Sequence, residues 1–325
     1  IGYFMALFES VRTNGRFLQR KRNLVLFCLF ALMLCLTKKT GLFVVIPTAV
    51  FLAIKLRRTA RDATTGSSPI VCLAPVIVSV AIAGLLLPLV VFPALNIAPG
   101  GKQEVLGPLF QQTARYVAYH EDEVTEQERE AIDGVLEYSR LAEDYQFDFE
   151  DAVKYRFKLD ATTEDIAAYL KVYVQQGMKH PESYAAAFWG LAGFYVAPIA
   201  FINIRMVTVD TKMGDGDEKR YMLWNPDELD GLRNGLDNAY GAIARIPGLN
   251  LPLLIVTYAL WFPTLLLYCM ARRQVKAAVL FVPFLVLLAF CMIAPVYDAR
   301  YVIPIFDGVP LLACAIFTLH RAKAK

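Results

Sequence analysis

Long apolar stretches occupy both ends of the chain, and a polar segment, 98–250, separates them. The stretches 69–97, 251–270 and 277–296 match or exceed the roughly 20 helical residues that a hydrocarbon core of about 30 Å requires. An apolar stretch of this length with few charges is typical of a membrane-spanning helix. The pattern therefore predicts three spans.

Three further apolar stretches, 23–36, 42–54 and 305–319, are shorter. Each reaches only about 20 Å at 1.5 Å per residue, so flanking residues, snorkelling side chains or tight protein packing must complete a crossing. We interpret them as short spans. The predicted fold class is all-α: a polytopic helical membrane protein with an extracytoplasmic α-helical domain.

Composition supports the membrane class. Hydrophobic residues make up 57% of the 325 positions, charged residues make up 19%, and the mean hydropathy is +0.44. An ordinary soluble enzyme is more polar than this. We expect contacts with membrane lipids and no nucleic-acid partner.

Charge predicts the orientation of the spans. Four short segments, 12–22, 55–61, 272–276 and 321–325, together hold 15 Lys and Arg. Because basic residues in short loops resist translocation, these segments are expected in the cytoplasm. The segment 98–250 has 15 Lys and Arg against 26 Asp and Glu, a net charge of −11, which suits the opposite side. We predict a multi-pass protein of the cytoplasmic membrane with this large loop outside.

The predicted organisation has three parts: a membrane region at 1–97, an extracytoplasmic domain at 98–250, and a second membrane region at 251–325. The stretch 184–203 is apolar enough to span, but a crossing there would reverse every later basic segment. We place it outside, as a helix that starts at Pro181 and lies on the membrane surface or on the tops of the spans. A seventh span is the alternative.

Capping signals predict helices in the external segment. In "VTEQERE" Thr125 is followed three residues later by Glu128, a capping box, and the apolar positions Ile132, Val135 and Leu136 keep helical spacing after it.

Two more helices carry similar signals. Thr162 and Asp165 form a second capping box before a helix expected to end at Gly177, and Asn225 with Pro226 opens a third helix. Together the three predict a small helical domain. The apolar stripe expected on the third helix consists of Leu229, Leu232, Leu236, Tyr240 and Ile243.

All six cysteines lie in apolar stretches and none lies in 98–250, so neither a disulfide scaffold nor a CxxC metal site is predicted. We expect free, buried thiols. The chain begins in apolar sequence, without an initiator Met or a signal-peptide pattern, and we expect it to be a C-terminal fragment. The cysteines are Cys28, Cys35, Cys72, Cys269, Cys291 and Cys314.

Four sequence motifs carry a resemblance: "TKKTGL", "GPLFQQTARY", "KHPESYAAAFWGLAGFYVAP" and "YDARYVIPIFDGVPLL". In this order, between the apolar stretches, they resemble the C-terminal part of GT-C-type membrane glycosyltransferases, specifically an uncharacterised bacterial group of that type. The resemblance implies transfer of a sugar from a polyprenyl-phosphate donor to a glycan, lipid or protein acceptor outside the membrane.

The resemblance also implies an acidic catalytic residue in the first external loop, which here would lie upstream of Ile1. The fragment alone is then expected to be inactive. No residue of the chain is assigned as the base and no metal site is predicted; a divalent cation stays open as a cofactor.

Substrate binding is assigned to cations and donors at the external ends of the spans, because the departing lipid phosphate gains negative charge. Juxtamembrane Lys and Arg also commonly bind ordinary headgroups, and Arg300 has Asp298 and Asp307 as alternative partners. The substrate-binding candidates are Lys38, Lys39, Gln112, Arg115, Arg300 and Tyr301.

Two external histidines, His120 and His180, each stand beside carboxylates. A neutral imidazole could act as a base or a ligand there, but a helix-end or surface role is the favoured interpretation. An interfacial aromatic belt is likewise favoured over sugar stacking for an aromatic group in the apolar stretch. That group consists of Phe188, Trp189, Phe194 and Tyr195.

A non-enzymatic class remains open: a sensor or assembly scaffold whose external domain binds a partner. A transporter is less favoured, because the three long spans contain no ionisable residue.

Overall fold

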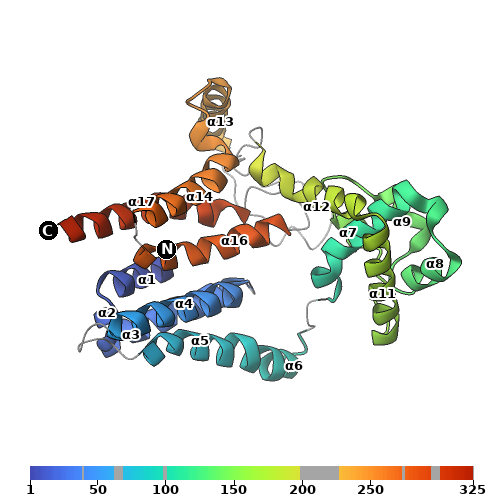
Figure 1. Ribbon diagram of the computed structural model, residues 1–325. Coiled ribbons are helices and arrows are strands. Elements are labelled where there is room, and N and C mark those ends of the chain that lie inside the picture. Colours follow the sequence, from blue (N-terminus) through green and yellow to red (C-terminus); the bar gives the residue numbers. More distant parts are fainter. Residues whose placement is uncertain are drawn as a thin grey trace.

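The computed structural model describes residues 1–38, 40–61, 69–97, 101–197, 227–272, 275–293 and 301–324. Within these ranges the chain is almost wholly helical, and the only β-type pairings are two isolated bridges, Leu136–Phe157 and Gln146–Phe149. The predicted all-α fold is confirmed. Figure 1 shows a set of long helices and, beside one end of it, a cluster of shorter ones.

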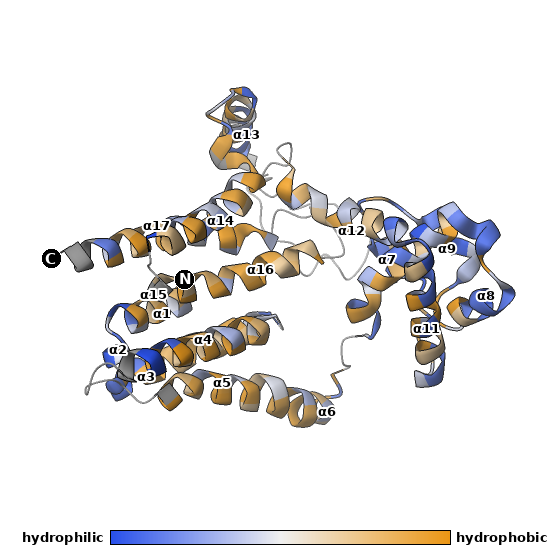
Figure 2. Cartoon of the chain, viewed as in Figure 1, coloured by the Kyte–Doolittle hydropathy of each residue, from blue (hydrophilic) through white to orange (hydrophobic). Residues whose placement is uncertain are grey.

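The long helices form what we name the apolar bundle, α1–α6 with α14–α17. Figure 2 shows apolar residues along these helices. Its N-terminal members are α1 (Gly2–Arg12), α2 (Arg16–Gln19), α3 (Lys21–Thr37), α4 (Gly41–Arg61), a 3-10 turn η1 (Pro69–Leu73), α5 (Ala74–Ser79), a π-helical segment η2 (Val80–Val91) and α6 (Phe92–Ala94). Its C-terminal members are a 3-10 turn η6 (Leu251–Leu253), α14 (Ile255–Ala271), α15 (Val275–Ala278), a 3-10 turn η7 (Val279–Phe281), α16 (Val282–Met292) and α17 (Ile303–Ala324).

Two helical stretches of the described chain, Ile70–Ala94 and Ile303–His320, are long and apolar enough to cross a membrane. Only 17% of the first stretch is buried inside the protein. Its outward side chains include Ile70, Ile77 and Leu89, each more than 60% exposed. Contact of so apolar a helix with water raises the free energy of the protein, and this supports membrane association.

The short apolar stretches become longer helices than their apolar residues alone suggest. Helix α4 has 21 residues and α17 has 22, about 30 Å each at 1.5 Å per residue. Helix α4 gains its length from the basic segment after Ile54. There Lys55 is buried and donates a hydrogen bond to the carbonyl of Val11 at 2.8 Å.

Helix α1 is part of the bundle core, which the sequence pattern did not predict. Leu7 is fully buried, Tyr3 stacks on Phe27 of α3 at 5.3 Å between ring centroids, and Phe4 meets Phe284 of α16 edge-on at 5.3 Å. Helix α1 has 11 residues and is too short for the sequence to predict a span. Only the packing shows that it belongs to the bundle core.

The shorter helices form the helical cluster, α7–α11. Its members are α7 (Gln103–His120), a 3-10 turn η3 (Glu121–Glu123), α8 (Glu126–Asp133), α9 (Tyr138–Asp144), α10 (Asp151–Lys154) and α11 (Thr163–Lys179). Their apolar faces share one core, in which Phe110 of α7 contacts Phe157 and Tyr169. This core is separate from that of the bundle.

Both predicted capping boxes are present. Thr125 and Glu128 open α8, and Thr162 and Asp165 open α11, each pair exchanging side-chain and backbone hydrogen bonds. Gly177, predicted to end α11, instead lies inside it, because the helix continues to Lys179. A Cβ at Gly177 would lie 2.8 Å from the ring of Tyr184, so the glycine serves close helix packing.

Helix α12 (Pro181–Val196) connects the cluster to the bundle, as Figure 1 shows. It begins at Pro181 as expected, packs on α7 and α11, and then contacts α14 and α16. Tyr195 near its end is 1% exposed within the bundle core, so this side chain cannot stack on a sugar, whereas Trp189 is 51% exposed. Residues 198–203 of the apolar stretch lie outside the described residues.

Helix α13 (Asp230–Arg245) follows a 3-10 turn η5 (Asp227–Leu229) and corresponds to the third predicted helix. The proposed cap at Asn225 and Pro226 lies outside the described residues. None of the residues of α13 is buried, and Leu232 is 60% exposed. Amphipathic spacing predicted the helix correctly, and no residue of α13 belongs to the core of the helical cluster.

All six cysteines are free, as predicted. Four are buried, but Cys28 is half-buried and Cys314 is exposed, so the prediction of burial is wrong for these two. They lie on α3 and α17, where helix spacing turns some apolar positions away from the bundle core.

Candidate functional site

Lys38 and Tyr301, two of the predicted substrate-binding residues, meet at one end of the bundle. Lys38 follows the last residue of α3 in an extended conformation, and Tyr301 precedes α17. The Lys38 ammonium lies 4.4 Å from the centroid of the Tyr301 ring. Lys38 is exposed, so this ammonium can be reached from outside the protein.

Two contacts position the backbone around Lys38 and Tyr301. The thiol of Cys291 donates to the carbonyl of Tyr301 at 3.4 Å, which links α16 to the start of α17. Gly41 starts α4, and a Cβ there would lie 2.5 Å from the carbonyl oxygen of Leu34. The missing side chain lets α4 approach α3 closely beside Lys38. Lys39 and Arg300 lie outside the described residues.

Gln112 and Arg115, the other two candidates, lie on α7 in the helical cluster. The Gln112 carbonyl accepts a hydrogen bond from the Tyr173 hydroxyl at 2.5 Å, and its amide donates to the carbonyl of Tyr184 at 3.3 Å. Both ends of this amide are therefore engaged in joining α7 to α11 and α12. A structural role explains Gln112 without a ligand.

Arg115 is surrounded by tyrosines. Its guanidinium donates to the Tyr145 hydroxyl at 3.0 Å and lies 4.5 Å from the centroid of the Tyr119 ring. Burial raises the pKa of Tyr145, and the hydrogen bond from Arg115 opposes this shift. The structure thus pairs Lys38 with Tyr301 and places Gln112 and Arg115 among aromatic side chains of the helical cluster.

The end of α7 lies where His120 and His180 come together. The rings of His120 and His180 stack with centroids 3.9 Å apart and 17° between their planes. Glu123 of η3 lies beside them: its Oε1 is 3.1 Å from His180 Nε2 and 3.8 Å from His120 Nδ1. We name these three residues the histidine site. The sequence showed each histidine beside carboxylates, but it did not show that they meet.

Charged neighbours surround the histidine site. Lys179 Nζ lies 2.8 Å from Glu123 Oε2, and His180 Nδ1 lies 2.8 Å from Glu182 Oε1. Hydrogen bonds from Lys179 and then His180 lower the pKa of Glu123 to about 2. Hydrogen bonds to Glu182 and then Glu123 raise the pKa of His180.

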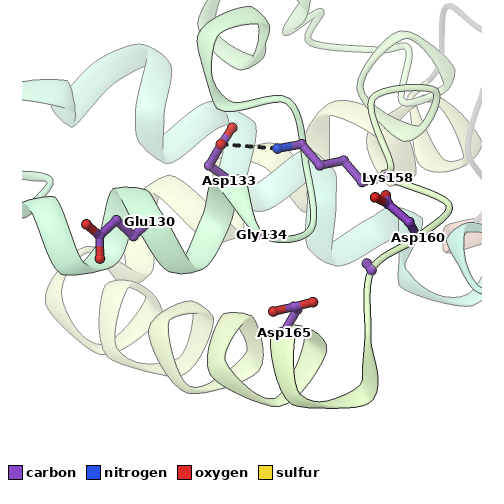
Figure 3. A pocket seen from close by; sticks show the side chains of 7 residues that line it. Glu130, Asp133, Gly134, Lys158, Asp160 and Asp165 are labelled. Carbon is purple, nitrogen blue, oxygen red and sulfur yellow. Dashed lines mark ion pairs between the residues drawn. The ribbon is translucent and has the colours of Figure 1, made fainter.

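An open hollow of about 330 Å³ lies between α8 and the start of α11. Figure 3 shows its carboxylates and the ion pair of Asp133 with Lys158, 3.1 Å apart. Asp133 also accepts from the backbone of Tyr138, and Asp165 caps α11. These contacts are structural, and a cluster of acids alone defines no ligand. The lining residues are Glu130, Asp133, Gly134, Lys158, Asp160, Ala161 and Asp165.

Fold and contacts together define a helical protein with an apolar bundle and a polar helical cluster attached at one end of it. The chain belongs to a family described as a family of unknown function, DUF6020, whose model matches residues 1–325. No curated protein and no solved structure matches the chain.

Proposed function

We propose that this protein is a multi-pass membrane glycosyltransferase of the GT-C type. It takes a sugar from a polyprenyl-phosphate donor and transfers it to a glycan, lipid or protein acceptor outside the bacterial cytoplasmic membrane. The observation that carries the proposal is the pairing of Lys38 with Tyr301. It joins two of the motifs, "TKKTGL" and "YDARYVIPIFDGVPLL", on which the family resemblance rests.

The arrangement of the bundle supports a multi-pass topology. In Figure 1, α6 and the end of α16 lie towards the helical cluster, whereas α17 leads away from it to the C terminus. Helix α2 and the start of α3, which carry basic residues, lie at the end remote from the cluster. Basic residues at the end remote from the cluster are what the positive-inside rule predicts for the cytoplasmic end of six crossings.

The chemistry of transfer gives Lys38 its role. The acceptor's nucleophilic atom forms a bond to the sugar's anomeric carbon while the bond from that carbon to the phosphate oxygen breaks, so the departing lipid phosphate carries the electron pair. An ammonium beside that phosphate stabilises its charge by charge-assisted hydrogen bonds. The Tyr301 ring holds the ammonium by a cation–π contact. The base that takes the acceptor's proton is assigned to no residue of the described ranges.

Lys38→Gln tests this role in membranes from cells that express the whole gene product. We expect transfer from lipid-linked sugars to fall roughly tenfold to a hundredfold, because losing a charged hydrogen bond costs about 1.5 to 3 kcal/mol. Lys171→Gln, on the exposed surface of α11, is the matched control and should transfer at the parental rate. A normal rate in a correctly inserted Lys38→Gln protein would remove Lys38 from the site.

A second function, binding of a partner by a non-enzymatic external domain, is favoured by one observation. Helix α13 exposes an apolar stripe in which Leu232, Leu236 and Ile243 are each more than 40% exposed. Absence of transfer by the unmodified protein from every lipid-linked sugar tested would favour this function over the transferase.

A further inference from the structure

We propose that His120, Glu123 and His180 form a binding site for one Zn²⁺ ion. The proposal does not rest on the glycosyltransferase function. Each residue offers one ligand atom, and the three atoms all lie within 4.8 Å of one another. Two imidazoles and one carboxylate are a ligand set that Zn²⁺ takes in proteins, with a fourth position left for water or a substrate.

The separations of the ligand atoms suit such an ion. Ligands bound roughly 2.0 to 2.2 Å from a tetrahedral Zn²⁺ lie about 3.4 Å from one another. Glu123 Oε1 lies 3.1 Å from His180 Nε2 and 3.8 Å from His120 Nδ1, on either side of that value. A metal ion lies in the plane of each imidazole that binds it, so the stacked rings, whose centroids are 3.9 Å apart, must rotate away from each other to bind one ion together.

Neighbouring groups fix the donors. The Nδ1 of His180 lies 2.8 Å from Glu182, so this carboxylate can accept its proton and leave Nε2 free to bind the ion. A carboxylate behind a histidine ligand is the usual support for bound zinc. The Tyr116 ring packs against both imidazoles, with centroids 5.3 Å from His120 and 5.7 Å from His180.

Lys179 is the one cation that already contacts the site among the described residues. Its ammonium lies 2.8 Å from Glu123 Oε2, while His180 Nε2 lies 3.1 Å from Oε1 and 3.2 Å from Oε2, and His120 Nδ1 lies 3.8 Å from Oε1. The two oxygens can thus serve the lysine and the metal ion at once. The side chains of His120, His180 and Glu123 are 24%, 20% and 36% exposed, so a hydrated ion can enter.

The site lies where three elements meet. His120 ends α7, Glu123 closes η3, and His180 stands between α11 and α12. An ion bound to all three would fix the start of α12, the helix that connects the helical cluster to the bundle. Zn²⁺ would therefore stiffen the junction between the two parts.

Zinc titration of the purified full chain in detergent, after removal of metal with a chelator, tests the proposal. We expect one Zn²⁺ per chain with a dissociation constant in the micromolar range or below. His120→Gln and His180→Gln should each remove this binding, and Glu182→Gln should weaken it roughly tenfold to a hundredfold. His320→Gln is the matched control, because it changes the remaining histidine of the chain, and it should bind as the parent does.

Cobalt provides a second measurement on the same proteins. Co²⁺ at a tetrahedral site gives visible absorption bands, which the parent should show and His180→Gln should lack. Unchanged elution and melting of the metal-free variants would show that they fold. Zinc binding that is equally tight in the double variant His120→Gln, His180→Gln, or no stoichiometric binding by the parent, would overturn the proposal.

Discussion

Glu150 is a carboxyl group enclosed by the helical cluster. It is 1% exposed, and its Oε1 would lie 1.8 Å from a Cβ at Gly107, so it packs where α7 has no side chain. Its Oε2 has no hydrogen-bond partner among the described residues. Burial raises the pKa of Glu150 to about 8, although the charge of Lys154 opposes the shift. The charged form is therefore unfavourable here.

The raised pKa predicts how stability depends on pH. The unfolded carboxyl releases its proton near its ordinary value of 4.5, and the folded one releases it near 8. Between these values the folded state holds one more proton, so the free energy of unfolding falls as pH rises through this window. The loss amounts to roughly 2 to 4 kcal/mol of unfolding free energy between pH 5 and pH 9, and Glu150→Gln should remove it.

Melting curves in detergent at several pH values measure this effect. The control is Glu130→Gln, which changes an exposed carboxylate of α8 and should keep the parental pH dependence. If Glu150→Gln and the parent lose stability in parallel from pH 5 to pH 9, Glu150 is charged at little cost and the argument from burial fails.

Helix α12 shows how single atoms decide the packing of elements. A Cβ at Gly190 would lie 2.1 Å from the backbone carbonyl oxygen of Phe147. A backbone atom cannot rotate away as a side chain can. Gly193, three residues later on the same helix, has no atom of a described residue within 4 Å of a Cβ. The two glycines therefore differ in role although their sequence setting is similar.

Alanine at these two glycines should have opposite effects. We expect Gly190→Ala to lower the free energy of unfolding by about 1 to 3 kcal/mol, because α12 must move away from Phe147. Gly193→Ala should be neutral or stabilise by up to about 1 kcal/mol, since alanine favours the helix over glycine. Unfolding of both variants, followed by circular dichroism, compares them; an equal effect would contradict the packing argument.

On the scale of the whole molecule, the apolar bundle exposes many apolar side chains, and contact between such a surface and water is unfavourable. On α3, α4 and η2, side chains such as Val25, Phe43 and Leu89 are each at least 60% exposed, while the core between the helices is closed. The outer surface of the helical cluster is polar, as Figure 2 shows for α8 and α9. This division matches a protein whose two parts face lipid and water.

Cysteine labelling tests the multi-pass topology that we propose. In a background without the six native cysteines, Ser139→Cys and Asp237→Cys should react in intact cells with a thiol reagent that cannot cross membranes, and Lys21→Cys should not. All three positions are exposed in the structure. Labelling of Ser139→Cys without Asp237→Cys would place a membrane crossing at the apolar stretch 184–203.

Local features of this protein were determined by the sequence alone. The capping boxes at Thr125 and Thr162 and the helix start at Pro181 depend on residues within one turn, so their pattern predicts them. The long apolar stretches likewise predicted helices that the structure contains. Hydrogen bonds between neighbours and apolar spacing are properties of short segments.

Only the tertiary structure decided which distant segments meet. It placed α1 in the core, left the stripe of α13 without buried residues, and brought His120 to His180. The pairing of Lys38 with Tyr301 joins positions near opposite ends of the chain. Such contacts depend on how whole helices pack, and local periodicity shows that a face is apolar without showing what covers it.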